Sequence, residues 1–188
     1  MSQLTKHNLV ISPIGLSDPA ILAKISQAVQ QAFGLQTESI SLLENVEFAY
    51  NSLRDQYLST LILEKLTELA PDQAFKILAI CEIDLFIPIL TYVYGEAQLS
   101  GKACIVSLFR LKHNEAPLPA QTEVYDKRVV KEAIHELGHT FGLRHCPDHA
   151  CLMHYCRSVD DVDQKSDRFC RYCQIMLDDV IKKLPLKC

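Results

Sequence analysis

The chain has 188 residues, 48% hydrophobic and 22% charged, which suits one globular domain with a sizeable core. Its 19 Lys and Arg against 23 Asp and Glu give a net charge of -4, which disfavours nucleic-acid binding. No apolar run is long enough to span a membrane, and the N-terminus lacks the layout of a secretory signal. We therefore expect a cytoplasmic protein that binds neither nucleic acid nor membranes.

The first part of the chain predicts strands alternating with helices. Residues 8–14 are typical of a strand, and Asp18 with Pro19 provides an N-cap and a first helical position. Residues 36–44 predict a second strand. From residue 55 to 69 apolar side chains recur at helical spacing, which indicates a second helix.

The middle and the end of the chain continue this alternation. Residues 75–86 form a long apolar run rich in β-forming residues, which is typical of a buried central strand. A short strand or turn is expected at 91–97 and a further strand at 102–111. Helices are predicted at 122–141 and 172–184. The alternation indicates an α/β protein with helices packed on a mixed sheet.

The most informative string is AIHELGHTFGLRHC, residues 133–146. His135 and His139 are four residues apart on a predicted helix, so both side chains leave one face at a spacing suited to one zinc ion. Gly142 can adopt a positive φ and end the helix, so that His145 can supply a third ligand. Three protein ligands leave one position open for water or substrate, which is the arrangement of a catalytic zinc site.

Glu136 directly follows the first of these histidines and points to the neighbouring side of the helix. There it can take a proton from a water whose pKa the metal has lowered to roughly 7. A bare HExxH pattern also occurs by chance in ordinary helices. The added glycine and third histidine make the longer pattern a much stronger indication of a catalytic zinc site.

Six of the eight cysteines fall within residues 146–188. Four of them form two closely spaced pairs that can surround a zinc ion with thiolates: Cys146, Cys151, Cys170 and Cys173. Such a site is filled by the protein and is therefore structural. Free thiols or two disulfides are the alternative, which a cytoplasmic location disfavours. We expect two Zn²⁺ per chain, one catalytic and one structural.

HELGHTFGLRHC, followed by CPDHACLM and a downstream CRYC, resembles the archaemetzincins, a branch of the metzincin zinc peptidases. The resemblance implies an α/β fold with a metzincin-like mixed twisted sheet, an active-site helix and a small zinc-stapled C-terminal subdomain. It implies one domain over residues 1–188, with an upper part at 1–142 and a lower part at 143–188.

The resemblance also implies roles for particular residues. The catalytic zinc falls to His135, His139 and His145, the general base to Glu136, and the structural zinc to Cys146, Cys151, Cys170 and Cys173. Met153 is the expected Met-turn beneath the zinc histidines. Tyr155 resembles a tyrosine that stabilises the oxyanion in some metzincins, although many metzincins lack it. The strand that pairs with an extended substrate is expected at Cys104–Leu111.

Other polar residues near the C-terminus are expected to take no part in metal binding. The acidic run of Asp160, Asp161 and Asp163 predicts a solvated loop. His149 and His154 are expected to be solvated loop histidines.

The sequence therefore predicts a zinc-dependent metallopeptidase that acts on peptide or protein substrates; it does not fix the oligomeric state, for which a monomer is favoured. One alternative is a catalytically silent two-zinc scaffold that binds a peptide, which the presence of Glu136 disfavours. A second is a metal-dependent endoribonuclease, because one bacterial family shares the three histidines. That family lacks the glutamate and favours basic surroundings, unlike this chain. The patterns do not separate endopeptidase from aminopeptidase action.

Overall fold

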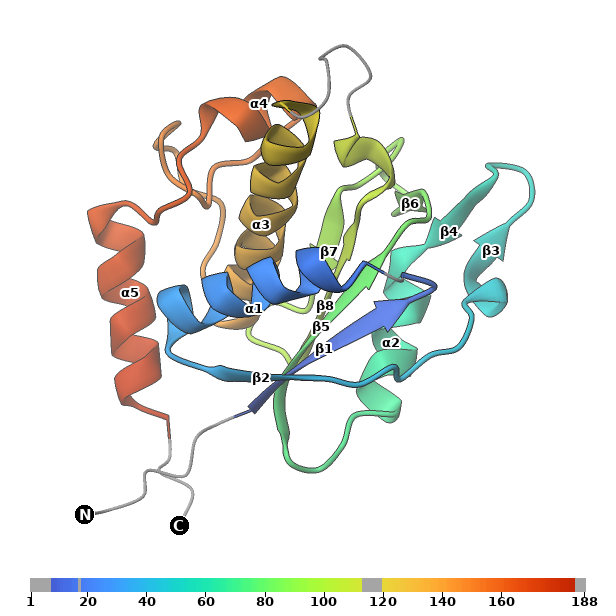
Figure 1. Cartoon of the computed structure of the whole chain (residues 1–188), viewed down its shortest axis with the longest axis horizontal. Coiled ribbons are helices and arrows are strands. Elements are labelled where there is room, and N and C mark those ends of the chain that lie inside the picture. Colours follow the sequence, from blue (N-terminus) through green and yellow to red (C-terminus); the bar gives the residue numbers. More distant parts are fainter. Residues whose placement is uncertain (1–7, 17, 113–119, 185–188) are drawn as a thin grey trace.

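The computed structural model describes residues 8–16, 18–112 and 120–184, with a five-stranded sheet at its centre (Figure 1). The strands of this sheet are β1 (Asn8–Ile14), β2 (Gln36–Ser39), β5 (Ala74–Cys81), β7 (Gly95–Ala97) and β8 (Ala103–Ser107). Their order is β2-β1-β5-β8-β7, and only the pair of β7 and β8 is antiparallel. A smaller sheet has the order β3-β4-β6 and contains β3 (Tyr50–Asn51), β4 (Gln56–Leu58) and β6 (Leu85–Phe86).

Helices cover both faces of the central sheet. They are α1 (Pro19–Phe33), α2 (Ser59–Glu68), α3 (Ala120–Thr140), α4 (Val159–Gln164) and α5 (Arg171–Lys182), with 3-10 turns at Glu47–Ala49 and Phe109–Leu111. Leu78 and Ile80 of β5 belong to the core under α1 and α3, whereas Ile77 and Ala79 belong to the core under α2. Because β5 is buried on both faces, its sequence is apolar without alternation, as predicted for a central strand.

The predicted start of the first helix is confirmed in atomic detail. The Asp18 side chain accepts hydrogen bonds from the backbone N–H groups of Ala20 and Ile21, and Pro19 occupies the first turn. These contacts satisfy donors that have no partner within the helix. Gly34 ends the helix at a φ of 68°, in the left-handed region that glycine adopts most easily.

Two predicted elements in the first half of the chain are shorter than expected. The strand predicted at 36–44 pairs with β1 only as far as Ser39. The helix predicted at 55–69 begins at Ser59, because Asp55 takes a φ of 52° in the turn between β3 and β4. The sequence prediction started the helix too early because the helical spacing of apolar residues continues back into this short hairpin.

Two predicted strands later in the chain also end early. The strand predicted at 75–86 leaves the central sheet after Cys81, and β6 then pairs with β4 in the smaller sheet. The strand predicted at 102–111 ends at Ser107, whose hydroxyl accepts a hydrogen bond from the 3-10 turn that follows. The helices predicted at 122–141 and 172–184 are confirmed as α3 and α5.

The acidic run is not the solvated loop that was predicted. Ser158 and Asp161 form a reciprocal capping box that starts α4, so the side chain of Asp161 is engaged with the backbone. Asp163 forms a two-pronged ion pair with Arg128 of α3. Asp160 and Asp163 are exposed, as was expected for the run, but Asp163 is held by its ion pair.

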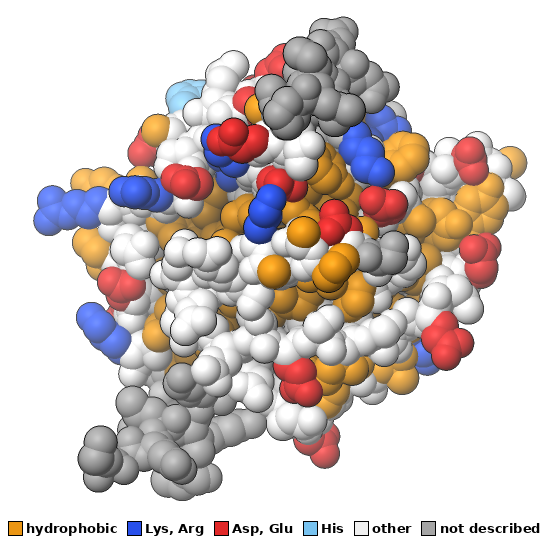
Figure 2. Space-filling model, in the orientation of Figure 1, with side chains coloured by type: hydrophobic (Ala, Val, Ile, Leu, Met, Phe, Trp, Pro, Cys, Tyr) orange, Lys and Arg blue, Asp and Glu red, His pale blue; other side chains and the backbone are white. Residues whose placement is uncertain are grey.

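Charged side chains of both signs are mixed over the face of the molecule shown in Figure 2. Exposed apolar side chains lie around β3, from the 3-10 turn before it to the turn after it, and they belong to Phe48, Tyr50 and Leu53. Among the described residues, no helix combines the length and the hydropathy needed to cross a membrane.

Candidate active site

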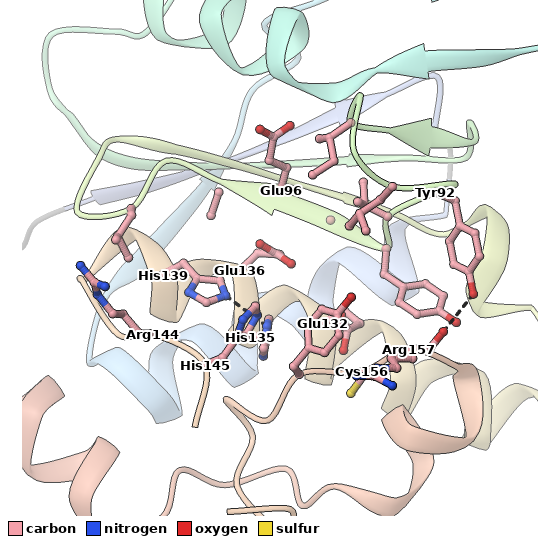
Figure 3. A pocket seen from close by; sticks show the side chains of 18 of the residues that line it. Tyr92, Glu96, Glu132, His135, Glu136, His139, Arg144, His145, Cys156 and Arg157 are labelled. Atoms are coloured by element: carbon pink, nitrogen blue, oxygen red, sulfur yellow. Dashed lines mark hydrogen bonds between the residues drawn. The ribbon is translucent and has the colours of Figure 1, made fainter. Parts of the chain in front are cut away.

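Three histidines come together at the C-terminal end of α3 (Figure 3). His135 and His139 lie one turn apart on the helix, and their Nε2 atoms are 3.2 Å apart. The chain leaves the helix at Gly142, whose φ of 90° lets it double back toward His145. One ring nitrogen from each histidine lies within 4.8 Å of the others. The predicted set of three is therefore gathered around one point.

The chemical state of these rings fits a zinc ion. Nδ1 of His135 lies 2.9 Å from the Leu152 carbonyl, and Nδ1 of His139 lies 2.7 Å from the Leu143 carbonyl. Because a carbonyl only accepts, each Nδ1 carries the proton and each Nε2 keeps its lone pair for a metal. Burial lowers the pKa of His135 well below its usual range and that of His145 to about 4. Neutral imidazole is the form that binds metals.

Glu136 lies between α3 and β7, on the cleft side of the helix (Figure 3). The backbone of β7 passes so closely over it that a Cβ at Gly95 would lie 2.6 Å from Glu136 Cγ. Burial raises the pKa of the Glu136 carboxyl well above its usual range, and the nearby charge of Glu132 raises it further. A carboxyl with a raised pKa beside three imidazoles is a candidate proton acceptor.

Met153 lies directly beneath the helix that carries the histidines. It is completely buried, and its Sδ would be 2.6 Å from a Cβ at Gly138. Its neighbour Leu152 provides the carbonyl that orients His135. Met153 therefore occupies the position that was predicted for a Met-turn.

The four predicted cysteines form a second cluster, in which the sulfur atoms lie within 4.8 Å of one another. The sulfur of Cys151 accepts hydrogen bonds from the backbone N–H groups of Met153 and Cys170. Hydrogen bonding to the backbone of Cys173 lowers the pKa of the Cys170 thiol. Backbone N–H donors of this kind stabilise thiolates, which are the form that binds zinc. The described cysteines form no disulfide, so the sulfurs are available to a metal.

A cleft of about 710 Å³ runs between β7 and α3, past the three histidines. Tyr155 lies at its edge, with its ring centroid 5.0 Å from that of His145. The predicted substrate strand at Cys104–Leu111 is wrong, because β8 is hydrogen-bonded to β5 on one side and to β7 on the other. The last strand of the sheet, next to the cleft, is β7, so Gly95–Ala97 has the edge that can pair with a peptide.

Comparison with known proteins places the chain in a family. The model of peptidase family M54 matches residues 24–179. An archaemetzincin of Methanocaldococcus jannaschii is 37% identical over 171 residues, which cover 91% of this chain and 93% of the relative. The chain belongs to the archaemetzincins. As a member of this family it is a zinc metallopeptidase, and its substrates are peptides or proteins.

Two solved archaemetzincin structures have the same fold. That of Methanopyrus kandleri superposes with a TM-score of 0.83 at 32% identity and covers 97% of this chain and 99% of its own. That of Archaeoglobus fulgidus, crystallised with malonate, gives a TM-score of 0.76 at 31% identity, covering 90% of this chain and 99% of its own. The predicted fold class, a metzincin-like mixed α/β sheet with an active-site helix, is confirmed.

Several cleft residues of this archaemetzincin were not found from the sequence. Glu132 lies one turn before Glu136 on α3, so its helical spacing could have placed it on the same face. Lys165 reaches the cleft only through the fold, and no local pattern indicates it.

Of the two spare histidines, His149 is exposed as expected, whereas His154 is half-buried and contacts the Cys146 carbonyl at 2.9 Å.

Proposed function

We propose that this protein hydrolyses peptide bonds in the cleft between β7 and α3, with Glu136 as the general base. In this proposal His135, His139 and His145 hold the catalytic zinc. The observation that carries it is the meeting of three neutral imidazoles beside one buried carboxyl of raised pKa that faces the cleft. Zinc bound there supplies Lewis acidity that polarises the scissile carbonyl and acidifies the attacking water.

Glu136 moves the proton during the reaction. Its carboxylate accepts a proton as water attacks the scissile carbonyl and then delivers that proton to the departing amine. Burial, which raises the pKa of this carboxyl, favours its uptake of the proton from the water. In this proposal Tyr155, whose ring packs against that of His145 in the cleft lining, would donate a hydrogen bond to the oxygen that becomes negative.

The four-cysteine cluster would hold the second, structural zinc. Cys146 follows His145 directly, so the two proposed metal sites share a continuous stretch of backbone. A closed thiolate site would fix the position of this backbone stretch and therefore also that of the His145 imidazole. A site of four reduced thiols also supports the proposed cytoplasmic location, where thiols are kept reduced.

The test is cleavage of a diverse peptide mixture by the zinc-loaded protein, read by mass spectrometry. Glu136→Gln should lower the cleavage rate by about 10²–10⁴-fold, the usual contribution of a general base, with the zinc content unchanged. Glu123→Gln is the matched control, because Glu123 lies on the same helix but is exposed and paired with Lys127. Cleavage by Glu136→Gln at the wild-type rate would refute the mechanism, and a wild type that cuts no peptide would favour the scaffold.

A further inference from the structure

A buried ion pair lines the cleft one helical turn from Glu136. Lys165 Nζ lies 2.7 Å from Glu132 Oε1, and the two side chains are only 0% and 5% exposed. Both residues line the cleft, and Glu132 lies beside His135 in Figure 3. Burying two charges does not by itself stabilise a fold, since desolvation offsets their attraction. The place of the pair beside the reacting groups therefore points to a role in the site.

The pair leaves one hydrogen-bond acceptor unused. Lys165 is held by Glu132 and by the thiol of Cys156. Oε1 of Glu132 accepts the hydrogen bond from Lys165, whereas Oε2 has no hydrogen-bond partner among the described residues. A buried acceptor without a partner is unfavourable. A ligand in the cleft that donates a hydrogen bond to Oε2 would remove this penalty.

The direction of β7 indicates which substrate residue reaches Glu132. Tyr94, just before β7, lies near Glu132, and Gly95 lies over Glu136. After the strand, Ser100 N–H donates to the carbonyl of His139. The strand thus runs from the Glu132 end of the cleft toward the His139 end. A peptide added antiparallel, the commoner pairing, runs the opposite way, so the residue after the cleaved bond lies at Glu132.

The charges around this position favour a neutral side chain. Lys165 neutralises Glu132 from behind, and Arg157 lines the same end of the cleft. Within the described part of the chain, the Arg157 guanidinium has no acidic partner. The positive charge of Arg157 would repel a cationic substrate side chain, and the lone pairs of Glu132 Oε2 would repel an anionic one.

We propose that Glu132, positioned by Lys165, selects substrates with a neutral hydrogen-bond donor, such as the carboxamide of Gln, immediately after the cleaved bond. This specificity rests on the proposed peptidase function of the same cleft. Glu132 touches the substrate side chain, and Lys165 acts only through Glu132.

Binding of peptide hydroxamates to the zinc-loaded protein tests the proposal without turnover. Three probes would differ only in the first side chain after the metal-binding group, which is that of Gln, Met or Lys. Calorimetry should give the Gln probe an affinity about tenfold higher than the Met probe of similar shape, because only Gln satisfies Oε2. Equal affinity for Gln and Met, or tighter binding of Lys than of Gln, would overturn the proposal.

A double variant separates this role from a structural one. Glu132→Leu with Lys165→Met removes both charges at similar volume, a change that buried ion pairs often tolerate. Its preference for Gln over Met should disappear while its zinc content is kept. The matched control is Arg128→Met with Asp163→Leu, an ion pair one turn earlier on α3 and outside the cleft lining. This control should keep the preference, and a preference retained by the Glu132 variant would contradict the inference.

The outcomes distinguish the two proposals. A wild type that cuts no peptide but prefers the Gln probe would refute the peptidase function and keep the binding specificity. A wild type that cuts peptides with no preference for Gln at the following position, and binds the Gln and Met probes equally, would refute the specificity alone.

Discussion

Gly95 shows how a single residue sets the geometry of the cleft. A Cβ at this position would meet Glu136 Cγ at 2.6 Å and the backbone oxygen of Ile105 at 2.7 Å. The Glu136 side chain could move aside, but the Ile105 carbonyl belongs to β8 and is fixed by the sheet. Only glycine therefore lets β7 approach both the neighbouring strand and the proposed base.

Gly95→Ala should consequently impair catalysis more than folding. The strand must move away from β8, and a displacement of about 1 Å at a reacting group can lower the rate about 100-fold. We expect kcat/KM to fall by that order while the circular dichroism spectrum stays unchanged. Gly138→Ala is a useful comparison, because its Cβ meets the flexible Met153 side chain and not a backbone atom. An unchanged kcat/KM in Gly95→Ala would show that β7 does not constrain Glu136.

At the level of elements, what could be predicted from the sequence was local. The helix start at Asp18, the ligand spacing on α3 and the cysteine pairs all depend on neighbours within a few residues. The early end of β5 and the edge position of β7 depend on strand pairing between distant segments. The pairing of Lys165 with Glu132 likewise joins α3 to the residue that follows α4, far along the sequence, so no spacing rule could have revealed it.

The loop from His145 to α5 provides the clearest prediction at this scale. Cys170→Ser with Cys173→Ser removes two of the four sulfurs, so the protein should bind one zinc fewer and melt at a lower temperature. The zinc at the three histidines should also dissociate more readily, because Cys146 no longer anchors the chain beside His145. Elemental analysis and thermal melting measure both effects.

Cys81→Ala is the control for these variants. Cys81 is completely buried in β5 and does not belong to the four-cysteine cluster. Its loss should therefore reduce stability without changing the zinc content. Full zinc content in the double serine variant would show that the four sulfurs bind no metal.

In the whole molecule, the C-terminal segment shares one core with the sheet. Leu152, Val162 and Leu177 belong to the same buried cluster as Leu78 of β5 and Val129 of α3. The segment that carries the cysteines is therefore held by apolar packing as well as by any metal. Its fold does not depend on zinc alone, unlike that of a minimal zinc finger.

Removal of zinc by a chelator should accordingly lower the melting temperature but leave a folded protein. Ligands that bind only the folded state stabilise it by mass action, so their removal lowers stability without abolishing the core. Thermal unfolding of the metal-free protein should remain a single transition, because both parts share one cluster. Two separate transitions, or an unfolded chain at 25 °C, would contradict this account.

The adjacency of His145 and Cys146 also restricts how this chain can change in length. One residue inserted between them would displace one ligand set from the other by up to about 3.5 Å, more than either coordination sphere can absorb. A residue added at the turn near Leu53, which is 95% exposed, would move no ligand. Natural variants of this protein should therefore gain and lose residues at that hairpin and never at the junction of the two ligand sets.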